Sequence, residues 1–313
     1  MNDLSTYVKR IKDGQVVAFP TETVYGLGAD AWNPSAILDV FKTKGRPSDN
    51  PLIVHVSSKA EIREFSDTLP NTALSLIDAF WPGPLTLVLK KKANVLDLIT
   101  SGLDTVAVRM PDHELALSFL SMTGPLVAPS ANKSGRPSPT KAEHVKNDFG
   151  KDFPVIDGGA TTIGLESTVV DLSDGKVVLL RPGKIGVTEI ESVLNEKVLF
   201  SDSEATVPKS PGQKYSHYKP NAQVVYGTID QIDDSFFYLL LDRRWGKSRN
   251  TINYNGDLEK LSRELYDRFR QADQFGYKKI YVEDLSSYKY EQPSFYAALK
   301  NRIEKACTED LNA

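Results

Sequence analysis

The chain has 313 residues, long enough for two domains, and its 40% hydrophobic and 25% charged residues are typical of a soluble globular protein. The net charge of −3 disfavours a large sequence-independent nucleic-acid binder, because such proteins usually carry a basic surplus. A single cysteine excludes an intrachain disulfide and a cysteine-based zinc site, and the four histidines lack metal-ligand spacing. The sequence contains no run of eighteen apolar residues and no secretory stretch, so we expect a cytoplasmic protein without a membrane span.

Residues 16–194 alternate short runs rich in Val and Leu with helical patterns. A helix is predicted over residues 34–43, with Asn33 as its N-cap and Pro34 at the first helical position. The other expected helices are 71–80, 114–121, 142–149 and 187–194, and the expected strands are 16–20, 52–56, 85–89, 105–110, 126–129, 167–171 and 176–181. This order predicts a mixed α/β domain over residues 1–200, with an extended twisted sheet and flanking helices.

Residues 201–222 interrupt this pattern. The segment is polar, contains three prolines and has no apolar periodicity, so we interpret it as an interdomain linker. In residues 223–313, two apolar strands flank an amphipathic helix that begins after Asp257 and ends at Gly276. The two strands are 236–241 and 280–282. Strand, helix and strand predict a small α/β domain with a right-handed parallel crossover.

Cations cluster between a predicted helix and a predicted strand. Lys42, Lys44 and Arg46 fall within five residues of one another and are followed by two prolines. Anionic ligands of α/β proteins commonly bind at such a sheet end, where Arg offers a planar fork for phosphate or carboxylate and Lys a point charge. The alternative is an ordinary solvated charged loop.

Residues 20–30, PTETVYGLGAD, are expected to form a second loop. Gly26 and Gly28 would let the backbone approach a ligand closely, and Thr21, Thr23 and the neighbouring tyrosine offer hydroxyls. The segment formally fits a relaxed dinucleotide fingerprint, but no helix opens at the second glycine, which disfavours such a site. An ordinary glycine turn is the competing interpretation.

Two further segments are rich in polar groups. Residues 129–140 carry hydroxyls and amides that can cradle phosphates or a ribose, and residues 164–171 place Ser167 at the start of a strand. Polar loops of this composition are usually only loops, so neither segment is specific alone. The chain has no G-x-x-x-x-G-K-[ST] loop and no G-x-S-x-G elbow, which excludes a P-loop enzyme and weakens a hydrolase interpretation.

Taken together, these segments resemble the threonylcarbamoyl-AMP synthase family, which is built on a YrdC-like domain. The matching motifs follow in order as PTETVYGLG, the K-x-R signature at Lys44-Gly45-Arg46, NPLIVH, WPGPLT, VAVRMP, APSANKSGRPSPT, GLESTVVD and RPG. Residues 210–220, SPGQKYSHYKP, are similar to the linker of the long, two-domain form, although Gln213, Ser216 and Lys219 depart from residues common there. Residues 223–313 resemble the extra domain of that form more weakly. The resemblance implies a YrdC-like twisted open mixed sheet followed by a small Rossmann-like α/β domain.

The resemblance also implies an L-threonylcarbamoyladenylate synthase, a nucleotidyltransferase that makes threonylcarbamoyl-AMP and pyrophosphate from L-threonine, bicarbonate or CO2, and ATP. The amine of threonine is carboxylated first, and the carbamate oxygen then attacks the α-phosphorus of ATP. A downstream enzyme transfers the threonylcarbamoyl group to tRNA, which this chain would itself bind weakly at most. Mg²⁺ is expected to arrive with ATP, without a tightly bound cofactor. The alternative is an RNA-binding YrdC-like module without synthase activity, which the acidic balance disfavours.

By the same resemblance, Lys44 and Arg46 are the catalytic cations that neutralise the triphosphate. Arg109 is expected to clamp the carboxylate of threonine, and His55 or Thr23 to meet its hydroxyl. The expected threonine pocket consists of Thr23, His55, Arg109, Ala128 and Ser167. The expected ATP site consists of Arg46, Asn50, Thr105, Ser130, Asn132, Ser138, Arg181, His217 and Tyr218.

The linker carries aromatic residues that would expose apolar surface if it were a passive tether. Two prolines restrict the ends of segment 210–220, which reduces the entropy lost when it settles over a ligand. We therefore predict that the linker closes over the active site and excludes water, with His217 or Tyr218 touching ATP or the adenylate. A structured linker that only docks the two domains is the alternative.

Overall fold

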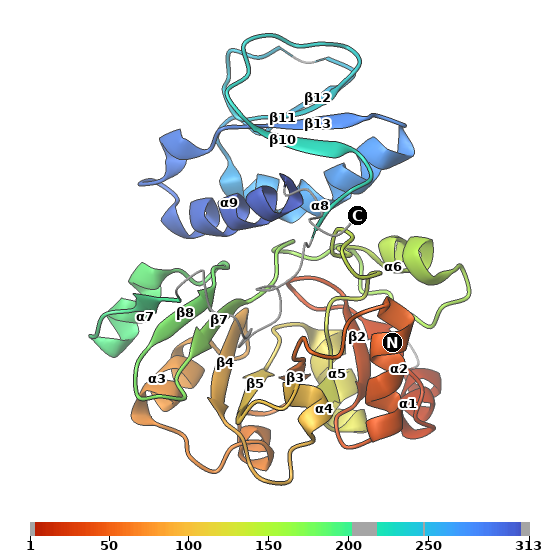
Figure 1. The fold of residues 1–313 in the computed structure, drawn as a ribbon, viewed down its shortest axis with the longest axis vertical. Helices are drawn as coiled ribbons and strands as arrows, with labels where there is room; N and C mark the ends of the chain where they lie inside the picture. The colour runs from red at the N-terminus through yellow and green to blue at the C-terminus, as the bar shows by residue number, and fades with distance from the viewer. Residues whose placement is uncertain (1–3, 202–217, 247, 308–313) are drawn as a thin grey trace.

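The computed structural model describes residues 4–201, 218–246 and 248–307. Within them the strands form two separate sheets, one in the lower and one in the upper part of Figure 1. We refer to residues 4–200 as the N-terminal unit and to residues 223–307 as the C-terminal unit. None of the described helices is long and apolar enough to cross a membrane.

The sheet of the N-terminal unit is mixed and open, with the strand order β1-β2-β6-β3-β5-β4-β7-β8-β9. Its strands are β1 (Val17–Phe19), β2 (Gly26–Asp30), β3 (Ile53–His55), β4 (Leu85–Lys90), β5 (Thr105–Arg109), β6 (Leu126–Val127), β7 (Thr168–Asp171), β8 (Val178–Arg181) and β9 (Leu199–Phe200). The pairs β3–β5, β4–β7 and β8–β9 are parallel and the other pairs antiparallel. The predicted mixed α/β fold class is confirmed.

Helices flank this sheet; the sequence predicted five of them and missed those at residues 5–12, 59–64 and 97–100. They are α1 (Ser5–Lys12), α2 (Pro34–Lys44), α3 (Asn71–Phe80), α4 (Asp97–Thr100), α5 (Glu114–Thr123), α6 (Ala142–Phe149), α7 (Val187–Leu194) and the 3-10 helix η1 (Lys59–Glu64). The predicted cap of α2 is confirmed, because the Asn33 side chain accepts from the backbone N–H groups of Ser35 and Ala36. Gly45 ends the helix in the left-handed conformation, with φ 60°, so that Lys44 and Arg46 flank the turn.

The expectation that residues 20–30 form a loop is wrong for their second half, because Gly26–Asp30 is strand β2, between β1 and β6. The glycines misled the prediction, since they usually mark turns. Here a Cβ on Gly28 would lie 3.0 Å from the Phe19 ring and 3.1 Å from Leu126. Gly28 thus lets β2 pack closely between its neighbours.

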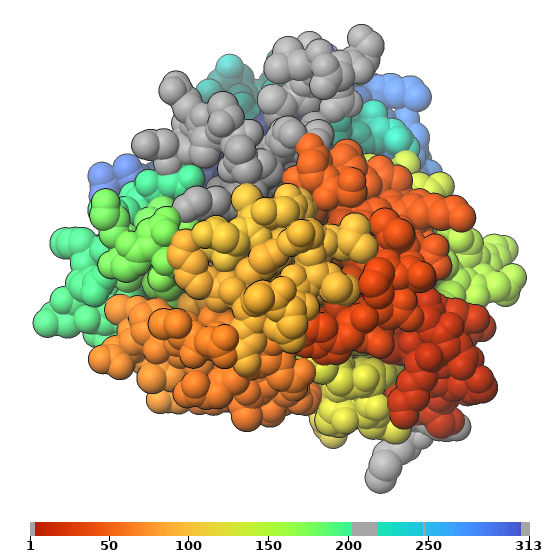
Figure 2. Space-filling model, turned by 60° about the horizontal axis from the view of Figure 1, so that its bottom comes forward, coloured from red at the N-terminus to blue at the C-terminus, as the bar shows by residue number. Residues whose placement is uncertain are grey.

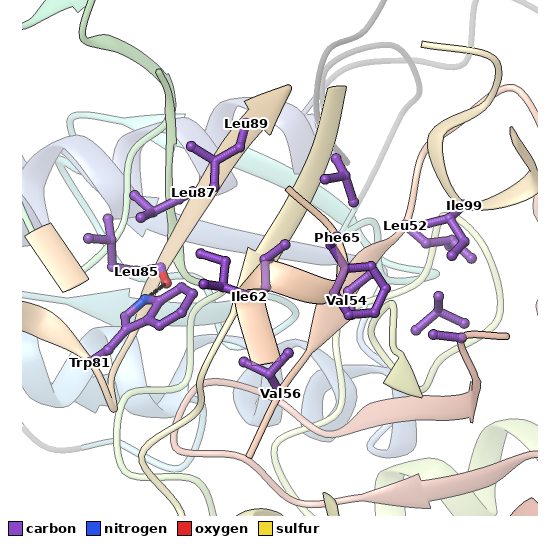
Figure 3. Close-up of a cluster of buried hydrophobic side chains, with 14 of the residues drawn as sticks. Leu52, Val54, Val56, Ile62, Phe65, Trp81, Leu85, Leu87, Leu89 and Ile99 are labelled. Carbon is purple, nitrogen blue, oxygen red and sulfur yellow. Dashed lines mark hydrogen bonds between the residues drawn. The ribbon is translucent and has the colours of Figure 1, made fainter. Parts of the chain in front are cut away.

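Strand alternation separates a core face from a site face. On β3, Val54 belongs to the main hydrophobic cluster, whereas Ile53 and His55 lie on the opposite face. Figure 3 shows this cluster, in which β4 contributes three leucines and the Trp81 indole donates to the Leu85 carbonyl at 2.7 Å. The core side therefore fixes the strands that carry the residues of the other face.

The sheet of the C-terminal unit is parallel throughout, in the order β10-β13-β11-β12. Its elements are β10 (Gln223–Gly227), β11 (Phe237–Leu240), β12 (Thr251–Asn253), α8 (Leu258–Gln274), β13 (Lys279–Glu283), the 3-10 helix η2 (Ser286–Tyr288) and α9 (Pro293–Cys307). The predicted parallel crossover from β11 to β13 is confirmed, and Asp257 caps α8 by accepting from the Lys260 N–H at 2.8 Å. The sequence analysis missed β10, β12 and α9.

The two units are in contact through helices. In Figure 1, α8 and α9 lie between the small sheet and the N-terminal unit. Figure 2 is turned so that the bottom of Figure 1 comes forward; red-to-gold segments of the N-terminal unit cover most of this face, and the C-terminal unit shows only at the upper edge. Residues of α8 and α9 hydrogen-bond to the segment that precedes β7, at Ile163 and Glu166.

Candidate active site

A cavity of about 60 Å³ lies on the site face of the large sheet. All five residues predicted for threonine line it, namely Thr23, His55, Arg109, Ala128 and Ser167. Four residues predicted for ATP also line it, namely Arg46, Ser130, Arg181 and Tyr218. A larger groove of about 640 Å³ between β8, α7 and α9 contains none of the predicted site residues. The chemistry of the side chains, rather than cavity size, therefore identifies the candidate site.

Neighbouring strands bring together the residues that are predicted to bind threonine. β3 and β5 are parallel, and their register sets His55 beside Arg109. On the other side of β5, the Thr86 hydroxyl of β4 lies 2.7 Å from the hydroxyl of Ser167, the residue before β7. Residues far apart in the sequence thus converge because their strands are adjacent in the sheet.

Arg109 is held by the protein on three sides. Its Nη1 donates to Thr23 Oγ1 at 2.8 Å, and its Nε donates to the Gly83 carbonyl at 3.2 Å. Its Nη2 lies 2.6 Å from Glu22 Oε1, an ion pair of two buried side chains that lacks the alignment of a hydrogen bond. A guanidinium fixed in this way is preorganised for planar recognition of a carboxylate.

His55 is buried and neutral. Its Nδ1 lies 3.3 Å from the Ile53 carbonyl, which can only accept, so Nδ1 carries the proton and Nε2 is an acceptor. Burial, and then the charge of Arg109, lower the pKa of His55 to about 3. At neutral pH the ring can accept a hydrogen bond from a substrate, but it is a poor proton acceptor.

Arg181 of β8 binds the residue that precedes β7. Its Nε donates to the Ser167 carbonyl and its Nη2 to the Ser167 hydroxyl, each at 3.0 Å. A residue predicted for ATP and a residue predicted for threonine therefore form one hydrogen-bonded unit.

The charges around the cavity favour an anionic ligand. Arg46, Arg109 and Arg181 all line it, and Glu166 is the only carboxylate among the described lining residues. That carboxylate is itself paired with Arg302, whose Nε lies 2.8 Å from Glu166 Oε2. The positive charge of the lining therefore exceeds the negative charge.

The two cations of the K-x-R signature lie in different places. Arg46 lines the cavity, and its guanidinium donates to backbone carbonyls that follow it in the chain, the nearer at 3.1 Å. Lys44 does not line the cavity, because its Nζ donates to the carbonyls of Ser130, at 2.5 Å, and Asn132, at 2.6 Å. Burial, and then the charge of Arg46, lower the pKa of Lys44 well below its usual value. Lys44 thus holds a loop, whereas the sequence predicted that it contacts phosphate.

Four residues predicted for ATP are buried but do not line the cavity: Asn50, Thr105, Asn132 and Ser138. The amide oxygens of Asn50 and Asn132 find no hydrogen-bond donor in the described part of the chain. Because buried amide oxygens are rarely left without a donor, both are candidates to accept from a bound nucleotide. Ser138 instead donates to Glu166 Oε1 at 2.6 Å.

Tyr218 lines the cavity and stacks on Tyr266 of α8, with 5.4 Å between ring centroids. The next residue, Lys219, donates its backbone N–H to the Gly135 carbonyl at 2.8 Å. His217 and most of the predicted lid, residues 202–217, lie outside the described residues. The lid therefore stays a prediction.

Sequence reasoning missed several residues of the site. Glu22 belongs to the PTET motif and directly precedes Thr23, a predicted site residue. A search for the carboxylate partner of a buried arginine could have found Glu22. Glu166 belongs to the GLESTVVD motif and lines the cavity. Arg302 and Tyr266 come from amphipathic helices of the other unit, and no local pattern distinguishes them from core residues.

No group of three or more His, Cys, Asp or Glu side chains within the described ranges is arranged to hold a metal ion. Glu166, the one carboxylate among the described lining residues, is engaged by Arg302. These donors do not fit a resident metal site.

An open mixed sheet with an arginine-lined cavity indicates a two-unit α/β protein whose site suits small anionic ligands. Comparison with models of known families agrees with this class of protein. A model described as telomere recombination, named for Sua5, YciO and YrdC, matches residues 9–183, and a model described as threonylcarbamoyl-AMP synthase, C-terminal domain, matches residues 185–308. The chain belongs to the threonylcarbamoyl-AMP synthase family.

Individual relatives cover nearly the whole chain. It is 44% identical to the threonylcarbamoyl-AMP synthase of Pyrococcus abyssi over an alignment 316 residues long, and the alignment covers 95% of this chain and 91% of the relative. It is 41% identical to the enzyme of the same name from Bacillus subtilis, over 95% of this chain and 90% of the relative. The crystal structure of P. abyssi Sua5 complexed with L-threonine matches with a TM-score of 0.87 and 39% identity, covering 96% of this chain and 93% of that one.

Proposed function

We propose that this protein is an L-threonylcarbamoyladenylate synthase. The observation that carries the proposal is a single buried cavity lined by Arg109, His55, Thr23 and Ser167 together with the cation Arg46. Relatives that match almost the whole chain bear the name threonylcarbamoyl-AMP synthase, and one similar structure contains L-threonine. The substrates are L-threonine, bicarbonate or CO2, and ATP, and the products are threonylcarbamoyl-AMP and pyrophosphate.

The threonine end of the cavity is the strand end where Arg109 and His55 lie side by side. The Arg109 guanidinium, fixed by Thr23, Glu22 and the Gly83 carbonyl, binds the substrate carboxylate. His55 Nε2, or the Thr23 hydroxyl, accepts from the substrate hydroxyl. With a pKa of about 3, His55 would need about 5 kcal/mol to take a proton at pH 7, so it positions the substrate rather than acting as a base.

The nucleotide end requires charge neutralisation more than covalent chemistry. A carbamate oxygen forms a bond to the α-phosphorus while the bond from that phosphorus to the β-phosphate oxygen breaks, and pyrophosphate leaves. Arg46 and Arg181 stabilise the negative charge that develops. Lys44 holds the Ser130–Asn132 backbone that borders this end of the cavity. Mg²⁺ enters as part of the MgATP substrate, mostly coordinated by phosphates and water.

An RNA-binding module without synthase activity is the weaker candidate. Such a module needs an extended basic groove, whereas this chain has a net charge of −3 and its arginine-lined cavity is only about 60 Å³. We propose that the contact with tRNA is indirect, through a cytoplasmic enzyme that transfers the threonylcarbamoyl group.

The proposal is tested by incubating the protein with L-threonine, bicarbonate and MgATP and detecting products by mass spectrometry. We expect threonylcarbamoyl-AMP and pyrophosphate, formed only when all three substrates are present. Serine, which lacks one methyl group, should react about 10- to 200-fold less efficiently, and valine, which lacks the hydroxyl, should be rejected more strongly. Absence of the adenylate under all conditions, or equal use of valine and threonine, would contradict the proposed function.

A further inference from the structure

A buried carboxylate connects the cavity wall to the C-terminal unit. Glu166 lines the cavity, and its Oε2 accepts from Arg302 Nε of α9 at 2.8 Å. The Tyr266 hydroxyl of α8 donates to the same oxygen at 3.1 Å, and the Ser138 hydroxyl of the N-terminal unit donates to the other carboxylate oxygen at 2.6 Å. The Arg302 side chain is 0% exposed and that of Glu166 9%, so the ion pair is buried.

The segment that carries Glu166 is built to receive α8. Gly164 has φ 82°, and a Cβ there would lie 2.4 Å from the Arg263 Cα, so only glycine lets the two backbones approach this closely. The Ser262 hydroxyl of α8 donates to the Ile163 carbonyl at 3.2 Å. The contact between the units is therefore a close backbone fit rather than a loose association of surfaces.

The C-terminal unit makes two more contacts with the segments that carry residues predicted for ATP, one through Arg302 and one through Arg270. The Arg302 guanidinium lies over the Tyr218 ring, 5.5 Å from its centroid. Arg270 of α8 donates to the Pro137 carbonyl, next to Ser138, and pairs with Asp148 at 2.8 Å. The C-terminal unit thus contacts Ser138 from its backbone side and, through Glu166, from its hydroxyl side.

Stability alone does not explain such an ion pair. Removing two charges from water is expensive, and apolar residues of similar volume often replace a buried ion pair at no cost in stability. Although burial alone would raise the pKa of Glu166, the charges of Arg302 and Arg181 and the hydrogen bonds from Ser138 and Arg302 lower it to about 2. Glu166 is therefore a permanent anion whose geometry depends on Arg302.

We propose that Arg302 is a positioning residue of the active site, which acts through Glu166 to hold Ser138 in place for ATP. The guanidinium proposed to bind the threonine carboxylate lies outside this chain of contacts, because Arg109 is held by Thr23, Glu22 and the Gly83 carbonyl. The inference rests on the proposed function for its substrate, and it assigns the C-terminal unit a share in the nucleotide subsite.

The test compares full-length Arg302→Met and Arg302→Lys with a control, Asp267→Ala. Asp267 of α8 bonds to Lys141 at 2.9 Å and His144 at 3.0 Å, so it joins the same two units without reaching the cavity. We expect Arg302→Met to raise the KM for ATP at least tenfold, with the Kd for threonine, measured without ATP, changed less than twofold. Arg302→Lys should recover part of the loss, and Asp267→Ala should leave the KM for ATP unchanged.

An unchanged KM for ATP in folded Arg302→Met, or an equal rise in Asp267→Ala, would overturn the proposal. If Arg302→Met fails to fold, Ser138→Ala decides, with a tenfold higher KM for ATP expected and an unchanged value contradicting the inference. Equilibrium dialysis with labelled ATP measures the same loss without turnover. A wild-type protein that makes no adenylate would therefore refute the proposed function while leaving the positioning of ATP by Arg302 separately measurable.

Discussion

The proposed threonine end of the cavity is built from adjacent strands of one sheet, whereas the proposed nucleotide end depends on loops and on the C-terminal unit. His55 and Arg109 are neighbours in a parallel strand pair, and the hydrophobic cluster on the opposite face fixes both strands. Ser138, by contrast, is held by Glu166, which is held by Arg302 of another unit. A subsite within one sheet is held rigid by the pairing of its strands. A subsite shared between two units can be altered by substitutions in the unit that lies farther from the substrate.

The largest expected effect is on turnover and should distinguish the nucleotide end of the cavity from the threonine end. Arg46→Ala should lower turnover several-hundred-fold, because the loss of one charge-assisted donor at such a site costs about 3–4 kcal/mol in the barrier. The Kd for threonine should stay within twofold of the wild-type value, since Arg46 plays no part in the contacts around Arg109. Steady-state kinetics and calorimetry measure the two quantities, and normal turnover at saturating substrates would show that the phosphates bind elsewhere.

Lys44→Met is the matched variant, because it removes the other cation of the same signature. We expect a lower free energy of unfolding as well as lower activity, since two buried carbonyls of the Ser130–Asn132 loop lose their donor. Arg46→Ala also removes a donor from two carbonyls, but these bonds are longer, 3.1–3.4 Å against 2.5–2.6 Å for Lys44, so we expect a smaller loss of stability. Equal thermal stability of the two variants would contradict the role of Lys44 as a loop anchor.

A smaller effect concerns the threonine end and pH. Because the folded protein holds the pKa of His55 at about 3, below the ordinary 6.5, the unfolded chain takes up a proton below pH 6.5 that the folded protein does not. Stability due to the neutral ring is therefore complete above pH 6.5 and is lost as the pH falls toward 3. Between pH 7 and pH 5, the wild type should lose about 2 kcal/mol more than His55→Gln in urea unfolding. Parallel losses in both proteins would show that His55 titrates normally.

The residues predicted for threonine all line one cavity, whereas several of those predicted for ATP do not, and the difference has a physical reason. Local signals such as the cap at Asn33 and the apolar strands have structural counterparts. Adjacent strands then bring the five residues predicted for threonine binding to one cavity. β2 was missed because its glycines serve close packing rather than a turn. Arg302 could not be predicted, because its partner is 136 residues away in the chain and lies across the contact between two units.

The K-x-R signature shows the same limit of sequence-based prediction within three residues. Lys44 is the last residue of α2, and Arg46 follows the left-handed Gly45, so the turn sends the two side chains to different partners. Composition identifies a cation cluster, but backbone geometry determines which cation meets the cavity.

A crystal structure with L-threonine bound tests the central claim most directly, because it shows which residues receive the substrate. The account predicts the carboxylate of threonine on the Arg109 guanidinium and its hydroxyl within hydrogen-bond distance of Thr23 Oγ1 or His55 Nε2. Threonine bound instead in the groove between β8 and α9, or with its carboxylate on Arg46, would contradict the placement of the two ends of the cavity.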